Sequence, residues 1–92
     1  MEVSDIVLAL AGRDKGGYFL IVGADDSFLY IADGRSRKVE SPKRKKRMHL
    51  QFEAKCAGIA AEKLKSGAKA SNNEIRRALN EFFTTAGEGL GR

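Results

Sequence analysis

The chain has 92 residues, of which 42% are hydrophobic and 32% are charged. This balance suits one small globular domain and excludes disorder along the whole chain. There are 17 Lys and Arg against 12 Asp and Glu, and the net charge of +5 favours polyanionic partners. A single Cys and a single His exclude an internal disulfide and a zinc site made of such ligands.

The first half of the chain predicts short strands separated by polar turns. Strand-like patterns occupy residues 6–10, 18–22, 28–32 and 48–53, with a short exposed strand at 37–40. Glycine-rich and acidic segments separate them, most clearly the turn from Gly12 to Gly17. Five short strands at this spacing predict a mainly β fold, with an antiparallel barrel over residues 1–52, because closure removes exposed sheet edges.

The second half, residues 53–92, predicts a helical appendage packed on the barrel. Its signals are an apolar face with helical spacing, a terminating Gly67, and a capping box formed by Ser71 and Glu74. A second apolar face follows, and the glycines of 86–92 predict a frayed tail. Mixed charge favours a lid over a second binding element. The residues of the two faces are Cys56, Ala57, Ile59, Ala60, Ala61 and Leu64, then Ile75, Ala78, Leu79 and Phe82.

The basic excess is concentrated in one stretch. Between Asp33 and Arg47 there are eight Lys and Arg against two acids, whereas the rest of the chain has nine positive and ten negative side chains. Five of the cations, Lys43–Arg47, are consecutive and predict a basic loop. Because like charges repel, folding alone does not explain the run, but a phosphate-binding loop does. A solvated loop that aids solubility and a nuclear-localisation signal remain alternatives.

The chain is expected to act in the cytoplasm, without a membrane partner. Its acidic N-terminus, Met1 to Asp5, differs from the basic start of a signal peptide. The longest apolar runs are much shorter than the about 20 residues of a membrane span. A chain this small without a disulfide framework also favours a reducing compartment.

Residues 6–22, with two apolar segments flanking Gly12-Arg13-Asp14-Lys15-Gly16, resemble a KOW motif. The continuation is similar to the large-subunit ribosomal group called L-fourteen-e/L-six-e/L-twenty-seven-e, and in particular to its short RNA-binding relatives in Gram-positive bacteria. It comprises Ala32-Asp33-Gly34-Arg35, Lys38, Pro42-Lys43-Arg44-Lys45 and His49-Leu50.

This resemblance covers residues 3–51, with a looser likeness at 62–64 and 73–79. It implies a five-stranded SH3-like barrel that binds structured RNA, as a ribosomal or ribosome-associated protein. The chain departs from true ribosomal proteins because it lacks their long basic extensions, which favours an accessory RNA binder.

The candidate RNA-binding residues are cations of the glycine turn and of the basic stretch, together with one histidine: Arg13, Lys15, Arg35, Arg37, Lys38, Lys43, Arg44, Lys45, Lys46, Arg47 and His49. Each phosphate that such a side chain neutralises releases counterions. Gly12 and Gly16 would let the backbone approach and offer N–H groups to phosphate oxygens. Tyr18 and Tyr30 are candidates for base stacking, or they fill the core.

No catalytic, cofactor or metal site is expected. The glycine run fails the spacing of both the dinucleotide fingerprint and the P-loop. The leading hypothesis is a non-catalytic RNA-binding protein of the translation machinery. The alternatives are an SH3-like peptide-binding module, whose aromatic cage would draw on Tyr18, Phe19, Phe28 and Tyr30, and a DNA or nucleoid binder.

Overall fold

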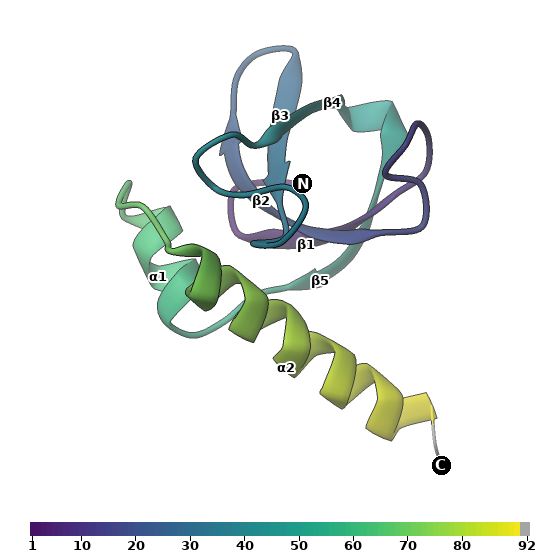
Figure 1. The fold of residues 1–92 in the computed structure, drawn as a ribbon, viewed down its shortest axis with the longest axis vertical. Coiled ribbons are helices and arrows are strands. Elements are labelled where there is room, and N and C mark those ends of the chain that lie inside the picture. The colour runs from purple at the N-terminus through teal and green to yellow at the C-terminus, as the bar shows by residue number, and fades with distance from the viewer. Residues whose placement is uncertain (91–92) are drawn as a thin grey trace.

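Five antiparallel strands form one curved sheet, and two helices lie along one side of it (Figure 1). The computed structural model describes residues 1–90, with side chains up to residue 85. The elements, in chain order, are β1 (Asp5–Ala9), β2 (Tyr18–Ala24), β3 (Phe28–Ala32), β4 (Lys43–Lys46), the 3₁₀ turn η1 (Arg47–His49), β5 (Leu50–Lys55), α1 (Ile59–Lys65) and α2 (Asn72–Leu90).

The strand order across the sheet is β4-β3-β2-β1-β5. The first four strands form a meander, and β5 returns to pair with the free side of β1, where Leu50 lies opposite Ala9. The register shifts once in β1, between Ile6 and Val7, and once in β2, between Ile21 and Gly23. Such irregularities increase the local twist of a strand, and the sheet curls so that η1 connects its two edge strands (Figure 1).

The sheet buries apolar side chains on both faces, because successive residues of a strand point to opposite sides. The inner face holds Val7, Ala9, Phe19, Ile21, Leu29, Ile31 and Leu50. The outer face contributes Ile6, Leu20 and Ala32 to a second core, which also contains Cys56, Ala60, Ala61, Leu64, Ala70, Ile75, Ala78 and Leu79 from the helices and the segments beside them. The helices therefore share a core with the sheet.

The predicted strands at 6–10, 18–22 and 28–32 are confirmed as β1, β2 and β3, and the predicted last strand begins two residues later than expected, as β5. The predicted strand at 37–40 is wrong, because this segment is a loop whose Val39 N–H donates to Asn72 Oδ1 of α2 at 2.8 Å. The Asn72 side chain thus satisfies the Val39 N–H, which in a strand would donate to a neighbouring strand.

The predicted basic loop is also wrong, because Lys43–Lys46 are strand β4 and only Arg47 continues into η1. Pairing with β4 satisfies the backbone groups along the free side of β3. Charged side chains are what natural edge strands carry, since they discourage pairing with another chain.

The helix boundaries follow the predicted capping residues. Gly67, with φ of +86°, ends α1: its N–H donates to Leu64 O, and the Ala68 N–H donates to Lys63 O, the bond pattern of a Schellman motif. Ser71 and Glu74 form the reciprocal capping box of α2, with bonds of 3.1 and 2.8 Å.

Two predictions about the second half of the chain differ from the structure. Cys56 is buried, as expected, but it precedes α1 and is not part of that helix. The backbone of α2 is helical as far as Leu90, where a frayed tail was expected from residue 86, and residues 91–92 lie outside the described part of the chain.

Candidate nucleic-acid interface

The loop between β1 and β2 is a fixed turn closed by its own backbone. Gly12 and Gly16 have φ of +78° and +88°, values that favour glycine. The N–H of Gly16 donates to Ala9 O at 2.9 Å, and the N–H of Gly17 donates to Asp14 O at 2.9 Å. The Gly16 N–H is therefore committed inside the loop, contrary to the expectation that it would serve a phosphate.

Asp14, in the middle of this loop, gathers two of the predicted RNA-binding cations. Arg37 donates to both of its carboxylate oxygens, Nε to Oδ1 at 3.0 Å and a second guanidinium nitrogen to Oδ2 at 3.2 Å. Lys45 Nζ lies 3.7 Å from Oδ2 and donates to Ala11 O at 3.0 Å. The side chains of Asp14 and Lys45 are each only 8% exposed and that of Arg37 is 28% exposed, so the centre of this cluster of three residues is buried and Arg37 lies at its edge.

The cluster fixes the ionisation of Asp14. Burial by itself would raise the pKa of this carboxyl, but the hydrogen bonds and charge of Arg37, together with the charges of Lys45 and Lys43, lower it below its ordinary value. The same hydrogen bonds raise the pKa of Arg37. Asp14 is thus a carboxylate at neutral pH, and it neutralises charge that the sequence assigns to RNA.

Glycine at position 12, where φ is +78°, leaves room for this cluster. A Cβ at position 12 would lie 2.9 Å from Lys45 Nζ, closer than real side-chain carbons approach a nitrogen. The absence of a side chain lets the ammonium group reach Ala11 O and Asp14. The glycine turn and the basic strand are therefore held together by Asp14 and Lys45.

Alternation along β4 separates Arg44 and Lys46 from Lys45, whereas Lys43, opposite Ile31 on the same side as Lys45, is exposed at the first position of the strand. Lys45 lies opposite Leu29, which points into the inner core, whereas Arg44 lies opposite Tyr30 and Lys46 opposite Phe28 on the outer face. Lys43, Arg44 and Lys46 are exposed, and Lys45 is buried. Of four consecutive cations, three can reach a partner.

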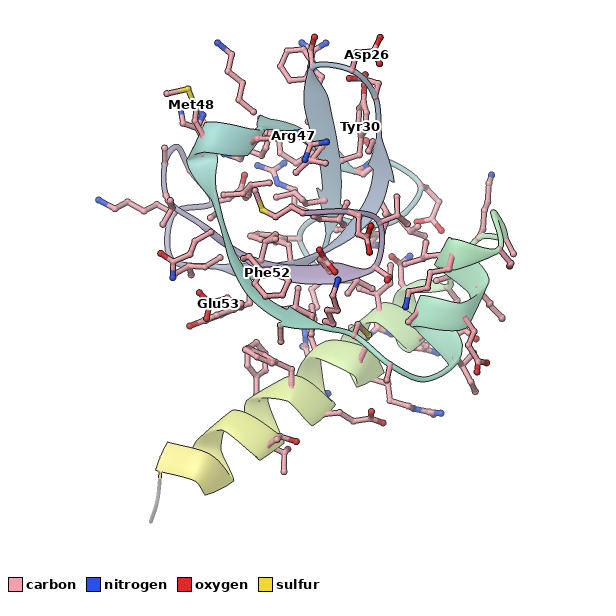
Figure 2. All side chains as sticks on the ribbon, turned by 180° about the vertical axis from the view of Figure 1, so that it is seen from behind. Asp26, Tyr30, Arg47, Met48, Phe52 and Glu53 are labelled. Atoms are coloured by element: carbon pink, nitrogen blue, oxygen red, sulfur yellow. The ribbon has the colours of Figure 1, made fainter. Side chains whose placement is uncertain are left out.

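The outer face of β3 and β4 combines rings with cations. The guanidinium of Arg44 lies over the ring of Phe28, 4.5 Å from its centroid. The hydroxyl of Tyr30 donates to Asp25 Oδ2 at 2.7 Å, which lowers the pKa of Asp25, raises that of Tyr30 and fixes the ring near the tip of the β2–β3 hairpin, marked by Asp26 in Figure 2. Tyr30 is half-buried, so part of its ring remains open to a partner.

The turn η1 lies beside the glycine loop, since Leu10 N–H donates to His49 O at 2.9 Å. Arg47 is exposed and donates to Met1 O at 3.0 Å, and Met48 points outward with 76% of its surface exposed (Figure 2). His49 is half-buried.

The remaining predicted cations occupy two exposed loops. Arg13 and Lys15 flank Asp14 in the glycine turn, and Arg35 and Lys38 lie in the loop after β3. Asp33 holds that loop by accepting from the N–H groups of Arg35 and Arg37 at 2.8 and 2.9 Å. Eight of the ten predicted cations are therefore exposed: Arg13, Lys15, Arg35, Lys38, Lys43, Arg44, Lys46 and Arg47.

The predicted stacking residue Tyr18 lies away from β4 and packs against α2. Its ring centroid is 5.6 Å from that of Phe82 and 5.4 Å from that of Phe83. The sequence did not single out Phe28 as the partner of Arg44, or Asp14 as the organiser of the site. For Asp14 a signal existed, because a lone acid between Arg13 and Lys15 suggests an internal partner for a cation.

Within the described residues, no group of three or more His, Cys, Asp or Glu side chains could hold a metal ion. Among the helices of residues 1–90, none is long and apolar enough to cross a membrane.

No protein-family model matches this chain, and comparison with characterised proteins finds no match either.

Proposed function

We propose that this chain is a non-catalytic RNA-binding protein of the cytoplasm that works at or near the ribosome. It binds structured RNA through its glycine turn, β4 and η1. One observation carries the proposal. The Asp14 cluster draws the glycine turn against the basic strand while leaving the cations on either side of it exposed. The buried Lys45 is neutralised by Asp14, and the exposed cations around it remain available to bind the phosphates of an RNA backbone.

The strand connectivity supports the fold that the resemblance implies. The β1–β2 hairpin, with its glycine turn, occupies the part of the chain that resembles a KOW motif. A four-stranded meander whose fifth strand returns to the first is compatible with an SH3-like barrel. In such a domain the hairpin turn and β4 would form one continuous RNA-binding surface.

Binding would rest mainly on electrostatics. Each exposed Lys or Arg that neutralises a phosphate releases condensed counterions, which supplies affinity without regard to sequence. Arg44 and Tyr30 add planar groups on which an unpaired base can stack. Because the contacts are to phosphates and base faces, the surface favours shaped RNA over a defined sequence.

The peptide-binding alternative receives less support. Phe19 lies in the inner core, Tyr18 packs on α2, and Phe28 is covered by Arg44. The rings that would have to form an aromatic cage are therefore divided among three places.

The test compares two triple variants with equal loss of charge. In the first, Lys43, Arg44 and Lys46 are replaced by Gln. In the control, Lys65, Lys69 and Arg77, exposed cations on or beside the helices, are replaced by Gln. Affinity for a fluorescently labelled RNA hairpin is measured by anisotropy over a range of salt concentrations.

The β4 variant is expected to bind at least about tenfold more weakly, and its plot of log affinity against log salt is expected to be shallower by about two to three units, one for each phosphate contact. The control should change far less, and both should keep the wild-type melting temperature. Equal losses in the two variants, or RNA affinity that survives in the first, would exclude this surface. Tighter binding of a DNA hairpin of the same sequence would favour the DNA-binding alternative.

A further inference from the structure

A pocket of about 290 Å³ lies where the glycine turn, the loop after β3 and α2 meet. This volume is near the lower end of the roughly 300–1,000 Å³ typical of ligand sites. Its walls include the Gly16–Gly17 backbone, the rings of Tyr18 and Phe83, and the side chains of Arg35 and Asn80. Asn80 and Phe83, which belong to α2, are not part of the RNA-binding surface described above.

The pocket is built on a rigid junction. The loop after β3 approaches α2 so closely that a Cβ at Gly34 would lie 2.5 Å from Asn72 O, and Gly34 also has φ of +78°. Arg76 of α2 donates to Gly34 O from one side of the junction. Asp33 holds the loop from within by accepting from two of its N–H groups. The walls are thus pre-organised, which lowers the entropic cost of binding.

The walls combine stacking, charge and hydrogen bonding. Phe83 is 45% exposed, and the edge contact of its ring with that of Tyr18 fixes the orientation of the ring. The exposed amide of Asn80 offers both a donor and an acceptor, and the exposed guanidinium of Arg35 offers donors and a planar face. Leu79, which is buried, adds an apolar wall.

We propose that this pocket receives one unpaired nucleobase of the bound RNA, stacked on Phe83, with its edge on Asn80 and its phosphate near Arg35. The proposal rests on the proposed function, since the glycine turn that lines the pocket is also part of the phosphate-binding surface. A base has a flat apolar face, a polar edge and an attached anion, and these match the ring, the amide and the guanidinium. Proteins recognise unpaired RNA bases by this combination of contacts.

The experiment uses two labelled RNA probes with the same number of nucleotides: a hairpin with an unpaired loop, and a blunt duplex with every base paired. The variants are Phe83→Ala and Asn80→Ala, of which the second removes an exposed polar group and spares the packing on Tyr18. Phe52→Ala is the matched control, because Phe52 has a similar exposure of 47% but lies on β5 (Figure 2) and does not line the pocket. Thermal melts of each variant test whether it folds like the wild type.

Phe83→Ala is expected to weaken hairpin binding by about tenfold, the effect of losing one stacked base, and to leave duplex binding unchanged. Asn80→Ala should weaken hairpin binding by a smaller factor, and Phe52→Ala should weaken neither complex. A hairpin with 2-aminopurine in its loop should lose fluorescence on binding to the wild type, and less so with Phe83→Ala.

Three outcomes would overturn the pocket as a base site: equal losses on both probes, no loss on either, or the same loss with Phe52→Ala. They leave the proposed function in place as long as wild-type protein binds both probes and the β4 variant binds both weakly. If neither probe binds wild-type protein, the proposed function itself is wrong.

Discussion

At the scale of single residues, Asp14 is the residue on which the site depends. It holds Lys45, which is almost fully buried, and Arg37, which reaches it from another loop. A buried ammonium group without a counter-ion is costly, because its hydration is lost and not replaced. The carboxylate therefore stabilises the fold and at the same time sets the positions of the exposed cations around it.

Replacing Asp14 by Asn is expected to lower the free energy of unfolding at pH 7 by about 2 kcal/mol. Because the pKa of Asp14 is lowered in the folded state, its contribution is complete above the ordinary carboxyl pKa of about 3.9 and is lost as the pH falls through the folded value. The difference between wild type and variant should therefore shrink below about pH 4.

Urea unfolding at a series of pH values measures this difference. Asp25, Glu40 and Glu74 also have lowered pKa values, but they are present in both proteins, so their effects cancel. Asp26→Asn, in an exposed turn, is the control and should change stability little. A pH-independent difference between wild type and Asp14→Asn would show that its charge is not what stabilises the cluster.

The sequence could not predict which cations are free. Lys43–Lys46 have nearly uniform chemistry, so no hydrophobic alternation marks a strand or its inward side. Only the pairing with β3 puts Lys45 on the inner face and Arg44 on the outer one. A loop was expected because β4 is defined by its partner strand, and the burial of Lys45 depends on Asp14, which is distant in sequence.

At the scale of elements, local capping signals predicted the helices well. Gly67 and the Ser71–Glu74 box mark real boundaries because each forms hydrogen bonds within a few residues of itself. The error at residues 37–40 has the opposite origin. Val39 and Glu40 are bound by the side chain of Asn72, a long-range contact that local patterns do not contain.

Ser71→Ala is expected to lower the free energy of unfolding by about 1 kcal/mol, because the hydroxyl that caps the Glu74 N–H is lost. Chemical denaturation followed by circular dichroism at 222 nm measures the change. Ser41→Ala, at an exposed position in the loop before β4, is the control. A change below about 0.3 kcal/mol, or one equal to that of the control, would mean that Glu74 and water cap the helix adequately without the serine.

At the scale of the whole molecule, the sheet has a core on each face, and the helices complete the outer one. Tyr18 reports on this junction directly, because its ring packs on Phe82 and Phe83 of α2. The composition predicted one small domain with a helical second half. It did not predict that Ile6, Leu20 and Ala32 would point toward the helices, because the alternation in those strands is apolar on both faces.

Because the outer core joins sheet and helices, the chain is expected to unfold in one cooperative transition. Urea transitions followed by tyrosine fluorescence and by circular dichroism at 222 nm should coincide. The variant Tyr30→Phe leaves Tyr18 as the only tyrosine, so the fluorescence then reports on the junction alone. Loss of helical signal at lower urea than the fluorescence change would show that the helices unfold separately.

The close approach of Lys45 to Gly12 changes how a familiar kind of experiment must be interpreted. A glycine in such a turn is commonly replaced by alanine to test whether its backbone contacts a phosphate. Here an alanine would displace the Lys45 ammonium group from its place beside Ala11 O and Asp14, and at φ of +78° it would also strain the turn. Weaker RNA binding by Gly12→Ala would therefore describe a disturbed scaffold and not a lost contact. Gly16 gives no cleaner answer, because with φ of +88° an alanine there would strain the turn even though its Cβ would face open space.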